Sequence, residues 1–101
     1  MVIISKTILK EFIKEYPDAG NAIQYWYDIT SKSDWKQFLG VKKSFNSVDS
    51  VGNDRYVFDI KGNQYRLVAL IFFSIRTVFI LFIGTYQSYD KIDAAKVEFK
   101  K

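Results

Sequence analysis

The feature that most constrains this chain is an apolar run in its C-terminal half, LVALIFFSIRTVFILFIG, residues 67–84. A run of this length could cross a bilayer as one helix. However, Ser74 and Arg76 interrupt it near the middle, where a guanidinium would lie in hydrocarbon. β-Branched and aromatic residues fill both halves, which is typical of buried strands. The run therefore predicts a hairpin of two strands, and we expect no membrane segment.

A third strand is predicted just before this hairpin. The segments RYVFDI, QYRLVALIFF and TVFILFIGT are rich in strand-forming residues, and short turns at residues 61–63 and 74–76 separate them. Such short connections join antiparallel strands, so the three segments form a meander. Over residues 68–73 both alternating faces of the strand are apolar. Helices on one side cannot cover both faces, so the second face either packs against the C-terminal tail or binds a partner.

The N-terminal half predicts a short strand and three helices. VIIS forms the strand, and KTILKEFIKEY then places its apolar residues on one stripe at helical spacing. Ser5 is the expected N-cap of this first helix, Pro17 ends it, and Asp18 is the expected cap of the second. A shorter third helix follows Ser33. The residues expected to face inward from the second and third helices are Ala22, Tyr25, Trp26, Ile29, Trp35, Phe38 and Leu39.

Helices first and a meander second predict an α+β fold, with the N-terminal helices packed on a mainly antiparallel twisted sheet. The chain has 101 residues, enough for one hydrophobic core, and 49% of them are hydrophobic, which argues against disorder. No linker or low-complexity tract divides the sequence. We therefore expect residues 1–101 to form a single domain.

The residue types that are missing limit the chemistry. The chain has no histidine, so it lacks the commonest general base and the commonest transition-metal ligand. It has no cysteine, which excludes a disulfide or a thiolate nucleophile and suits the reducing cytoplasm, where we expect the protein to be. Because no cluster of Asp or Glu occurs either, we predict no metal site and no cofactor. The net charge of +4 weakly favours a polyanionic partner.

Several polar residues are predicted to meet at one end of the meander. If residues 74–76 form a three-residue turn, Phe73 pairs with Thr77, and Arg66 then lies opposite Gly84. Tyr86 follows on the same side as Gly84 and becomes a diagonal neighbour of Arg66. Because Gly84 has no side chain, we expect an open space there, bordered by a guanidinium and a phenol. Such a space would suit a phosphodiester.

A purely structural interpretation of the same residues stays open. Arg66 could pair with Asp59 or Asp90 and neutralise the edge of the sheet. Tyr86 and Tyr89 could lie flat over the sheet, anchored through their hydroxyl groups. Spacing alone does not decide between a site and a stable edge.

The series WYDITSKSDWKQF, VKKSF, VGND, YVFDIKGNQYRLVALI and IGTYQSYDKID resembles the HigB-type toxins of bacterial type II toxin–antitoxin modules. The resemblance covers almost the whole chain in order, and the combination of DWK, KGN-x-YRL and GT-x-x-x-YDKID is specific. It implies the fold of the RelE-like superfamily and a ribosome-dependent mRNA endonuclease without a metal. It also implies a cognate antitoxin, with the toxin either a monomer or part of a hetero-oligomer with that antitoxin.

The resemblance also implies roles for individual residues. In these enzymes the RNA 2′-hydroxyl attacks the adjacent phosphate, a step that needs a base, cations at the phosphate and a proton for the leaving oxygen. Arg66 would clamp the phosphate, Tyr89 would stack on a base, and Asp90 would orient its neighbours. The residues expected to act in catalysis are Arg66, Tyr86, Tyr89 and Lys91, and those expected to bind RNA are Lys61, Asn63 and Arg55.

Two positions depart from the family pattern. Tyr86 stands where the pattern commonly has histidine, and Leu81 stands where a basic residue is often found. A phenol with an ordinary pKa of ~10 is a poor base at neutral pH. The sequence therefore leaves two hypotheses, a nuclease that uses tyrosine or a weakened or inactive homologue that binds antitoxin or ribosome. A general binder of single-stranded RNA ranks third.

Overall fold

The computed structural model describes residues 1–98, so the last three residues of the predicted 1–101 domain lie outside the described residues. Within this range the chain alternates short strands and helices before it enters the meander. In chain order the elements are β1 (Val2–Ile4), α1 (Thr7–Glu15), a 3-10 turn (Pro17–Ala19), α2 (Gly20–Lys32), α3 (Phe38–Ser44), β2 (Val48–Gly52), β3 (Arg55–Ile60), β4 (Tyr65–Phe72), a second 3-10 turn (Phe73–Ile75), β5 (Thr77–Thr85) and α4 (Tyr86–Tyr89).

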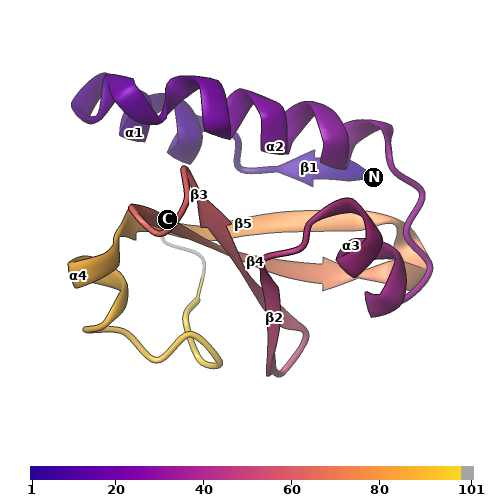
Figure 1. The fold of residues 1–101 in the computed structure, drawn as a ribbon. Coiled ribbons are helices and arrows are strands. Elements are labelled where there is room, and N and C mark those ends of the chain that lie inside the picture. Colours follow the sequence, from indigo (N-terminus) through magenta and orange to yellow (C-terminus); the bar gives the residue numbers. More distant parts are fainter. Residues whose placement is uncertain (99–101) are drawn as a thin grey trace.

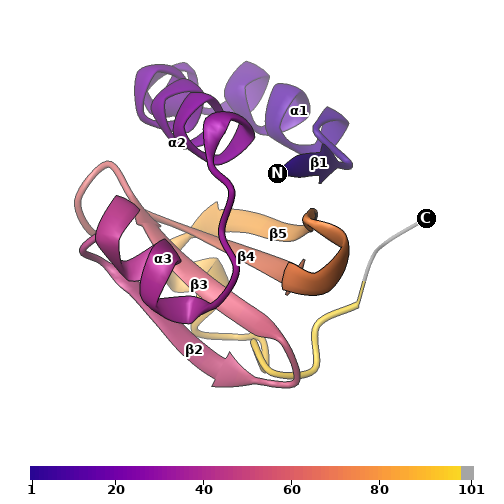
Figure 2. The same ribbon diagram turned by 90° about the vertical axis from the view of Figure 1, so that its right-hand side faces the viewer.

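The five strands form one sheet in the order β1-β5-β4-β3-β2. Strands β2 to β5 are antiparallel to their neighbours, and only β1 lies parallel to β5. Helices α1 and α2 lie side by side over one face of the sheet, while α4 and the C-terminal segment lie on the other side (Figures 1 and 2). The predicted α+β fold, with N-terminal helices on a mainly antiparallel sheet, is confirmed. Strand β2 was not predicted, because VDSVG lacks a clear apolar alternation.

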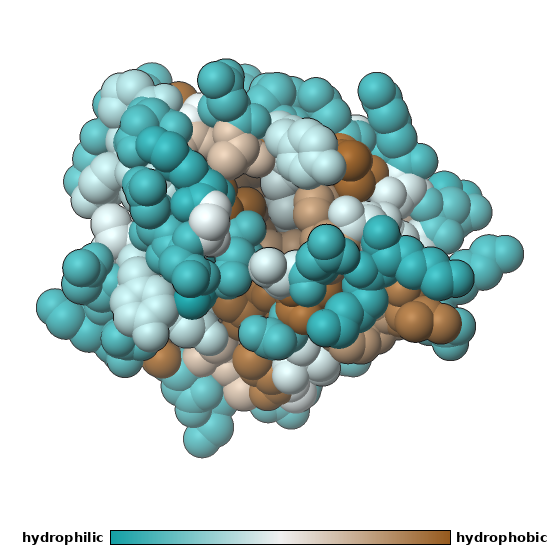
Figure 3. Space-filling view, viewed as in Figure 1, coloured by the Kyte–Doolittle hydropathy of each residue, from teal (hydrophilic) through white to brown (hydrophobic). Residues whose placement is uncertain are grey.

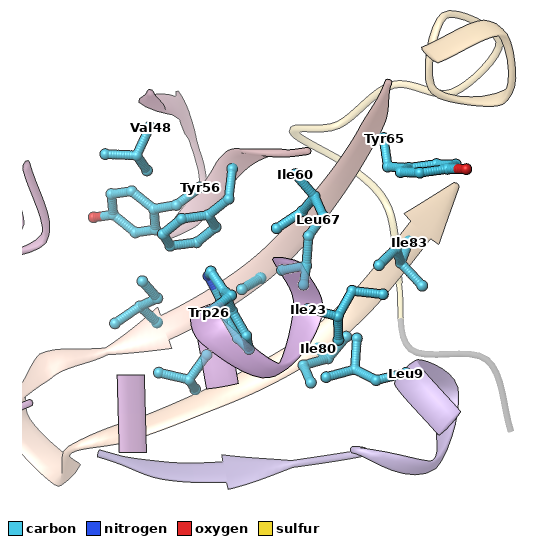
Figure 4. Packing of buried hydrophobic residues seen from close by; sticks show 14 of the residues in the cluster. Leu9, Ile23, Trp26, Val48, Tyr56, Ile60, Tyr65, Leu67, Ile80 and Ile83 are labelled. Atoms are coloured by element: carbon cyan, nitrogen blue, oxygen red, sulfur yellow. The ribbon is translucent and has the colours of Figure 1, made fainter. Parts of the chain in front are cut away.

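The core lies between the helices and the sheet. Ile23 and Trp26 of α2 point toward Ile60 and Leu67 of the sheet, and Trp26 packs edge-on against Phe58 with ring centroids 5.4 Å apart (Figure 4). These side chains come from helix positions three apart and from alternate strand positions, as amphipathic elements require. The largest fully buried side chains are Trp26, Phe58, Ile23, Leu67, Ile71 and Ile80.

The residues that α2 and α3 turn toward the core differ in part from the predicted ones. Tyr25 is 61% exposed and Leu39 is 56% exposed, so neither belongs to the core. Helix α2 instead buries Ile23, Trp26 and Thr30, a stripe that is rotated relative to the expected one. The error arose because both faces of α2 carry large apolar residues, and only the sheet decides which face it covers.

Two predicted helix caps are also wrong. Ser5 has a left-handed backbone, with φ of 76°, in the turn out of β1, and Lys6 occupies the position before α1 without a side-chain cap. Asp18 lies inside the 3-10 turn, and Ala19 precedes α2. Pro17 does follow the end of α1, as predicted, and it starts the 3-10 turn.

The β4–β5 hairpin contains a compensating irregularity. Phe72, rather than Phe73, pairs with Thr77, so the predicted turn register is wrong by one residue. The register shifts again between Val68 and Ala69, which face Phe82 and Ile80 across the ladder. The residue between these two partners, position 81, is therefore the extra residue of a β-bulge. Beyond the bulge Arg66 lies opposite Gly84, as the sequence predicted.

The outer face of the sheet is covered in part by the tail that follows α4. Val57, Val68 and Ala94 form a small buried cluster there, and Ile92 and Val97 pack against it. Of the two alternatives for this face, packing against the tail holds for this part. At the other edge of the same face Val2, Ile4 and Phe72 remain exposed. No helix within residues 1–98 combines the length and the apolar character needed to span a membrane.

Candidate functional site

The centre of the candidate site is an ion pair between neighbouring strands. Asp59 of β3 and Arg66 of β4 face each other in the ladder, and Oδ1 of Asp59 lies 2.6 Å from Nη1 of Arg66. Asn63, in the turn between the two strands, accepts a second hydrogen bond from Nη1 at 3.2 Å. The side chains of Arg66 and Asp59 are 14% and 25% exposed, so both are only partly open to solvent.

Two tyrosine rings flank this guanidinium. The Cζ atom of Arg66 lies 4.9 Å from the ring centroid of Tyr86 and 5.8 Å from that of Tyr89, within the range of cation–π contacts. Tyr86 is 44% exposed. The structure thus brings together Arg66, Tyr86 and Tyr89, as the sequence predicted.

The tyrosines reach Arg66 from a helical turn and not from an extension of β5. Thr85 begins α4 by accepting a hydrogen bond from the backbone N–H of Ser88 at 3.1 Å. The backbone N–H of Tyr86 donates to the carbonyl of Gln64 at 3.2 Å, which ties α4 to the β3–β4 turn. One helical turn places positions three apart on one side, so both rings lie near the same guanidinium.

The open space expected at Gly84 is not there. A Cβ atom at this position would lie 2.6 Å from Cζ of Phe82 and 3.3 Å from Cβ of Ser88. The absent side chain therefore makes room for the Phe82 ring, which packs toward the tail on the outer face. Any space for a phosphate lies beside the guanidinium rather than over Gly84.

Lys61 makes its contact with the helical layer. Its Nζ lies 2.8 Å from Oδ2 of Asp18, and the hydroxyl of Tyr65 donates to the same carboxylate at 2.8 and 2.9 Å. The hydrogen bonds from Lys61 and Tyr65 lower the pKa of Asp18, and the bond to Asp18 raises the pKa of Tyr65. These contacts explain why Asp18 is not a helix cap. They also engage the ammonium group of Lys61 away from Arg66, so its contact with RNA stays a prediction.

Arg55 and Lys91 are not gathered around Arg66 by any described contact. The Arg55 guanidinium donates to the carbonyls of Val97 and Asn53 and lies 3.2 Å from Oε1 of Glu98, so it anchors the tail. Arg55 begins β3 while Asp59 lies near its other end, which separates the two along the strand. Lys91 is exposed just after α4. RNA binding by Arg55 and a catalytic role for Lys91 stay predictions.

Burial shifts the pKa values of the Tyr89 phenol and of the Asp59 carboxylate next to Arg66. Burial raises the pKa of Tyr89 and outweighs the lowering by Arg66, and Asp49, Asp59 and Asp90 raise it further. Tyr89 therefore holds its proton more firmly than a free phenol, which makes it a poor candidate for the base. Burial also raises the pKa of Asp59, with an opposing effect from Arg66 and a further rise from Asp49. Asp59 is thus more basic than an ordinary carboxylate.

A separate groove of about 740 Å³ opens between the start of α1, the middle of β5 and the tail. Its lining includes apolar residues such as Leu81 and Phe82, together with Glu11 and Glu98, and no lysine or arginine. Such a lining repels a polyanion, so we place the candidate site at Arg66, which does not line this groove. Figure 3 shows a hydrophilic surface over most of the face seen in Figure 1, with apolar residues visible in a hollow near its centre.

Residues 1–98 offer no group of three or more Asp, Glu, His or Cys side chains that could hold a metal ion. The site therefore combines a cation, two phenols and a carboxylate. A guanidinium can hold a phosphate through two parallel hydrogen bonds, and aromatic rings can stack on unpaired bases. This set suits binding and cleavage of a single-stranded RNA backbone. The sequence reasoning placed Asp59 only as a structural partner of Arg66, and position alone gave no signal of more.

Comparison with known proteins agrees with this chemistry. Residues 19–92 match the HigB_toxin family, described as the RelE-like toxic component of a toxin-antitoxin system. A protein of Escherichia coli O6:H1 named mRNA interferase HigB is 30% identical over 94 residues, which is 91% of each chain. The mRNA interferase toxin HigB of Escherichia coli strain K12 is 28% identical over 92 residues, 89% of this chain and 88% of its own. The chain therefore belongs to the HigB family of RelE-like toxins.

Proposed function

We propose that this protein cleaves mRNA on the ribosome, without a metal ion, as the toxin of a type II toxin–antitoxin pair. The observation that carries the proposal is the Arg66 guanidinium, held by Asp59 and Asn63 and flanked by Tyr86 and Tyr89. The family and the names of the relatives, which are mRNA interferases, support the same activity. We also propose that residues 1–101 form a single domain, and that the protein acts in the cytoplasm, where translating ribosomes are.

The proposed reaction uses the RNA as its own nucleophile. Arg66 binds the scissile phosphate and stabilises the charge that grows on its oxygens as the 2′-hydroxyl attacks. The Tyr86 and Tyr89 rings hold the neighbouring bases by stacking, which fixes the strand relative to the guanidinium. Lys91 supplies a further cation for catalysis, and Lys61, Asn63 and Arg55 bind the RNA. Asn63 also holds the Arg66 side chain through its hydrogen bond from Nη1.

The test is induced expression of the wild type and of Arg66→Ala without antitoxin, with growth followed and mRNA ends mapped at translating ribosomes. Loss of one group that stabilises the transition state costs about 100- to 1,000-fold in rate, so Arg66→Ala should relieve growth arrest and remove the mapped ends. Arg76→Ala is the matched control, because Arg76 is exposed at the opposite end of β4–β5 and pairs with Asp34. Equal growth of all three strains, with soluble and abundant protein, would refute the proposal.

A second candidate function rests on Tyr86, which replaces the histidine common in the family pattern. In this alternative the protein is a weakened or inactive homologue that binds antitoxin or ribosome. The variant Tyr86→His separates the two functions. Toxicity that appears only in Tyr86→His favours the binding module, whereas a toxic wild type favours the nuclease.

An antitoxin is the proposed protein partner. Its motive is the family, together with the exposed apolar residues Val2, Ile4 and Phe72 on the outer face of the sheet. Co-purification of the tagged chain with the product of the neighbouring gene tests this partnership. A monodisperse free toxin with no affinity for that product would count against it.

A further inference from the structure

We propose that Asp59 is the general base of this site and takes the proton from the RNA 2′-hydroxyl. The inference rests on the proposed nuclease function and adds to it a catalytic residue. It gives the carboxylate next to Arg66 the task that a histidine would perform.

The first step of the argument is that the reaction needs a base and the chain has few groups that could act as one. It contains no histidine and no cysteine. Tyr89 holds its proton at neutral pH, because burial and the nearby carboxylates raise its pKa. Within residues 1–98, Asp59 is the one carboxylate that contacts the Arg66 guanidinium.

The second step concerns which edge of the guanidinium is occupied. Both Asp59 and Asn63 bind Nη1 of Arg66. Among the described residues none accepts a hydrogen bond from Nε or Nη2. These two atoms form the parallel pair of donors that matches two oxygens of a phosphate. A phosphate bound at that edge would lie beside the Asp59 carboxylate on the same planar group.

The third step is the position of the nucleophile. The attacking 2′-oxygen belongs to the nucleotide whose 3′-oxygen carries the scissile phosphate, so it stays close to that phosphate. With the phosphate held by Nε and Nη2, the carboxylate on Nη1 is within reach of the 2′-hydroxyl. Asp59 is 25% exposed, which leaves the carboxylate accessible from the outer face of the sheet.

The charges around Asp59 support this role. Burial raises its pKa, Asp49 of the neighbouring strand raises it further, and Arg66 opposes both effects. Tyr86 and Tyr89 of α4 also face this cluster, and the Tyr86 ring lies nearer to the guanidinium. A carboxylate of raised basicity beside a cation accepts a proton more readily than an exposed aspartate does.

The step balances without any further reactant. The 2′-oxygen gives its proton to a carboxylate oxygen of Asp59 and forms a bond to phosphorus. The bond from phosphorus to the 5′-oxygen breaks, and the electron pair stays on that oxygen, which takes a proton from Tyr89 or from water. The products are a 2′,3′-cyclic phosphate and a 5′-hydroxyl. Asp59 returns its proton to solvent, and a Tyr89 phenolate formed in this step takes a proton from solvent.

The experiment compares single-turnover cleavage of mRNA on purified ribosomes by the wild type, Asp59→Asn, Asp59→Glu and Asp49→Asn over a range of pH. We expect Asp59→Asn to lower the cleavage rate about 100- to 10,000-fold with little change in KM, and to abolish the acidic limb of the pH profile. Asp59→Glu should retain more activity than Asp59→Asn. Asp49→Asn removes a carboxylate that raises the pKa of Asp59 and does not contact Arg66, so it should keep the acidic limb but shift it to lower pH.

A cleavage rate of Asp59→Asn close to that of the wild type would overturn the inference. So would a rise in KM with an unchanged acidic limb, because Asp59 would then only orient Arg66. If Asp59→Asn fails to fold, the acidic limb of the wild type and the rate of Asp59→Glu still decide. A wild type that makes no cuts refutes the proposed function itself, whereas an active wild type with an active Asp59→Asn refutes only the role of Asp59.

Discussion

The two faces of the sheet differ in character, since one carries the core and the other carries the candidate site. The inner face carries the large uncharged side chains of β3, β4 and β5 and is covered by α1 and α2. The outer face has a buried cluster of only Val57, Val68 and Ala94, with the Asp59–Arg66 pair beside it. Because successive residues of a strand point to opposite faces, β4 supplies both Leu67 to the core and Arg66 to the site.

This difference shows why the site can tolerate charge. A buried ion pair costs desolvation energy that its attraction does not always repay. The outer face leaves Asp59 and Arg66 partly exposed, and only a short helical turn and the tail cover it. The stability needed to hold this arrangement comes from the other face.

The largest expected effect is a loss of stability when the core on the inner face is disrupted. Replacement of Trp26 by Ala removes the side chain that packs on Phe58 and leaves a cavity, which should lower the free energy of unfolding by about 3–5 kcal/mol. Leu39→Ala is the control, since Leu39 is exposed and should change the same quantity by no more than about 0.5 kcal/mol. Denaturant unfolding measures both, and equal losses would mean that Trp26 is not at the centre of the core.

A smaller effect is expected on the outer face at Gly84. Gly84→Ala places a Cβ atom against the Phe82 ring and should destabilise the protein by about 1–3 kcal/mol, with some loss of cleavage because α4 begins nearby. Gly20→Ala is the matched control, because its Cβ would lie at an ordinary 3.6 Å from Ile13. Thermal unfolding of the two variants compares them. A Gly84→Ala protein as stable as Gly20→Ala would show that Phe82 moves aside freely.

The smallest expected effect is on the pH dependence of stability, to which the carboxylates of Asp18 and Asp59 contribute in opposite directions. The pKa of Asp18 is lowered by its hydrogen bonds from Lys61 and Tyr65, so the stability it contributes is present above the ordinary pKa and is lost as pH falls through the lowered one. Burial raises the pKa of Asp59, so its contribution is fully present below the ordinary pKa and is lost as pH rises through the raised one.

The free energy of unfolding, followed against pH for the wild type, Asp18→Asn and Asp59→Asn, should separate these two contributions. Asp18→Asn should reduce the loss of stability in acid, and Asp59→Asn should increase it. Changes of the same sign in both variants would contradict the opposite shifts of the two pKa values.

Much of the fold could be predicted from the sequence because its signals are local. The strands β3, β4 and β5 follow from β-branched and aromatic runs between turn residues, and Pro17 marks the end of α1. Features that depend on tertiary contacts could not be predicted from the sequence. Strand β2 is held by pairing with β3 and has no strong pattern of its own, and the apolar face that α2 buries is decided by the sheet.

The position of Arg66 opposite Gly84 was predicted correctly although the predicted pairing of β4 and β5 contained two errors, because the two errors cancel. The pairing next to the turn differs by one residue from the predicted pairing. The unpredicted bulge at position 81 shifts the pairing back by one residue, so that Arg66 lies opposite Gly84. Neither departure has a sequence signal, because a bulge in an apolar run changes no residue type. The Lys61 contact with Asp18 was also beyond prediction, since it joins residues 43 positions apart.

The order of the site residues along the chain has a consequence for synthesis. Asp59 and Arg66 belong to one hairpin joined by a short turn, so their pairing requires only local closure. The rings of Tyr86 and Tyr89 come from α4, which is made after all the strands. A nascent chain would therefore carry the charged pair before the two aromatic rings that flank it, and the candidate site would be complete only after α4 has been made.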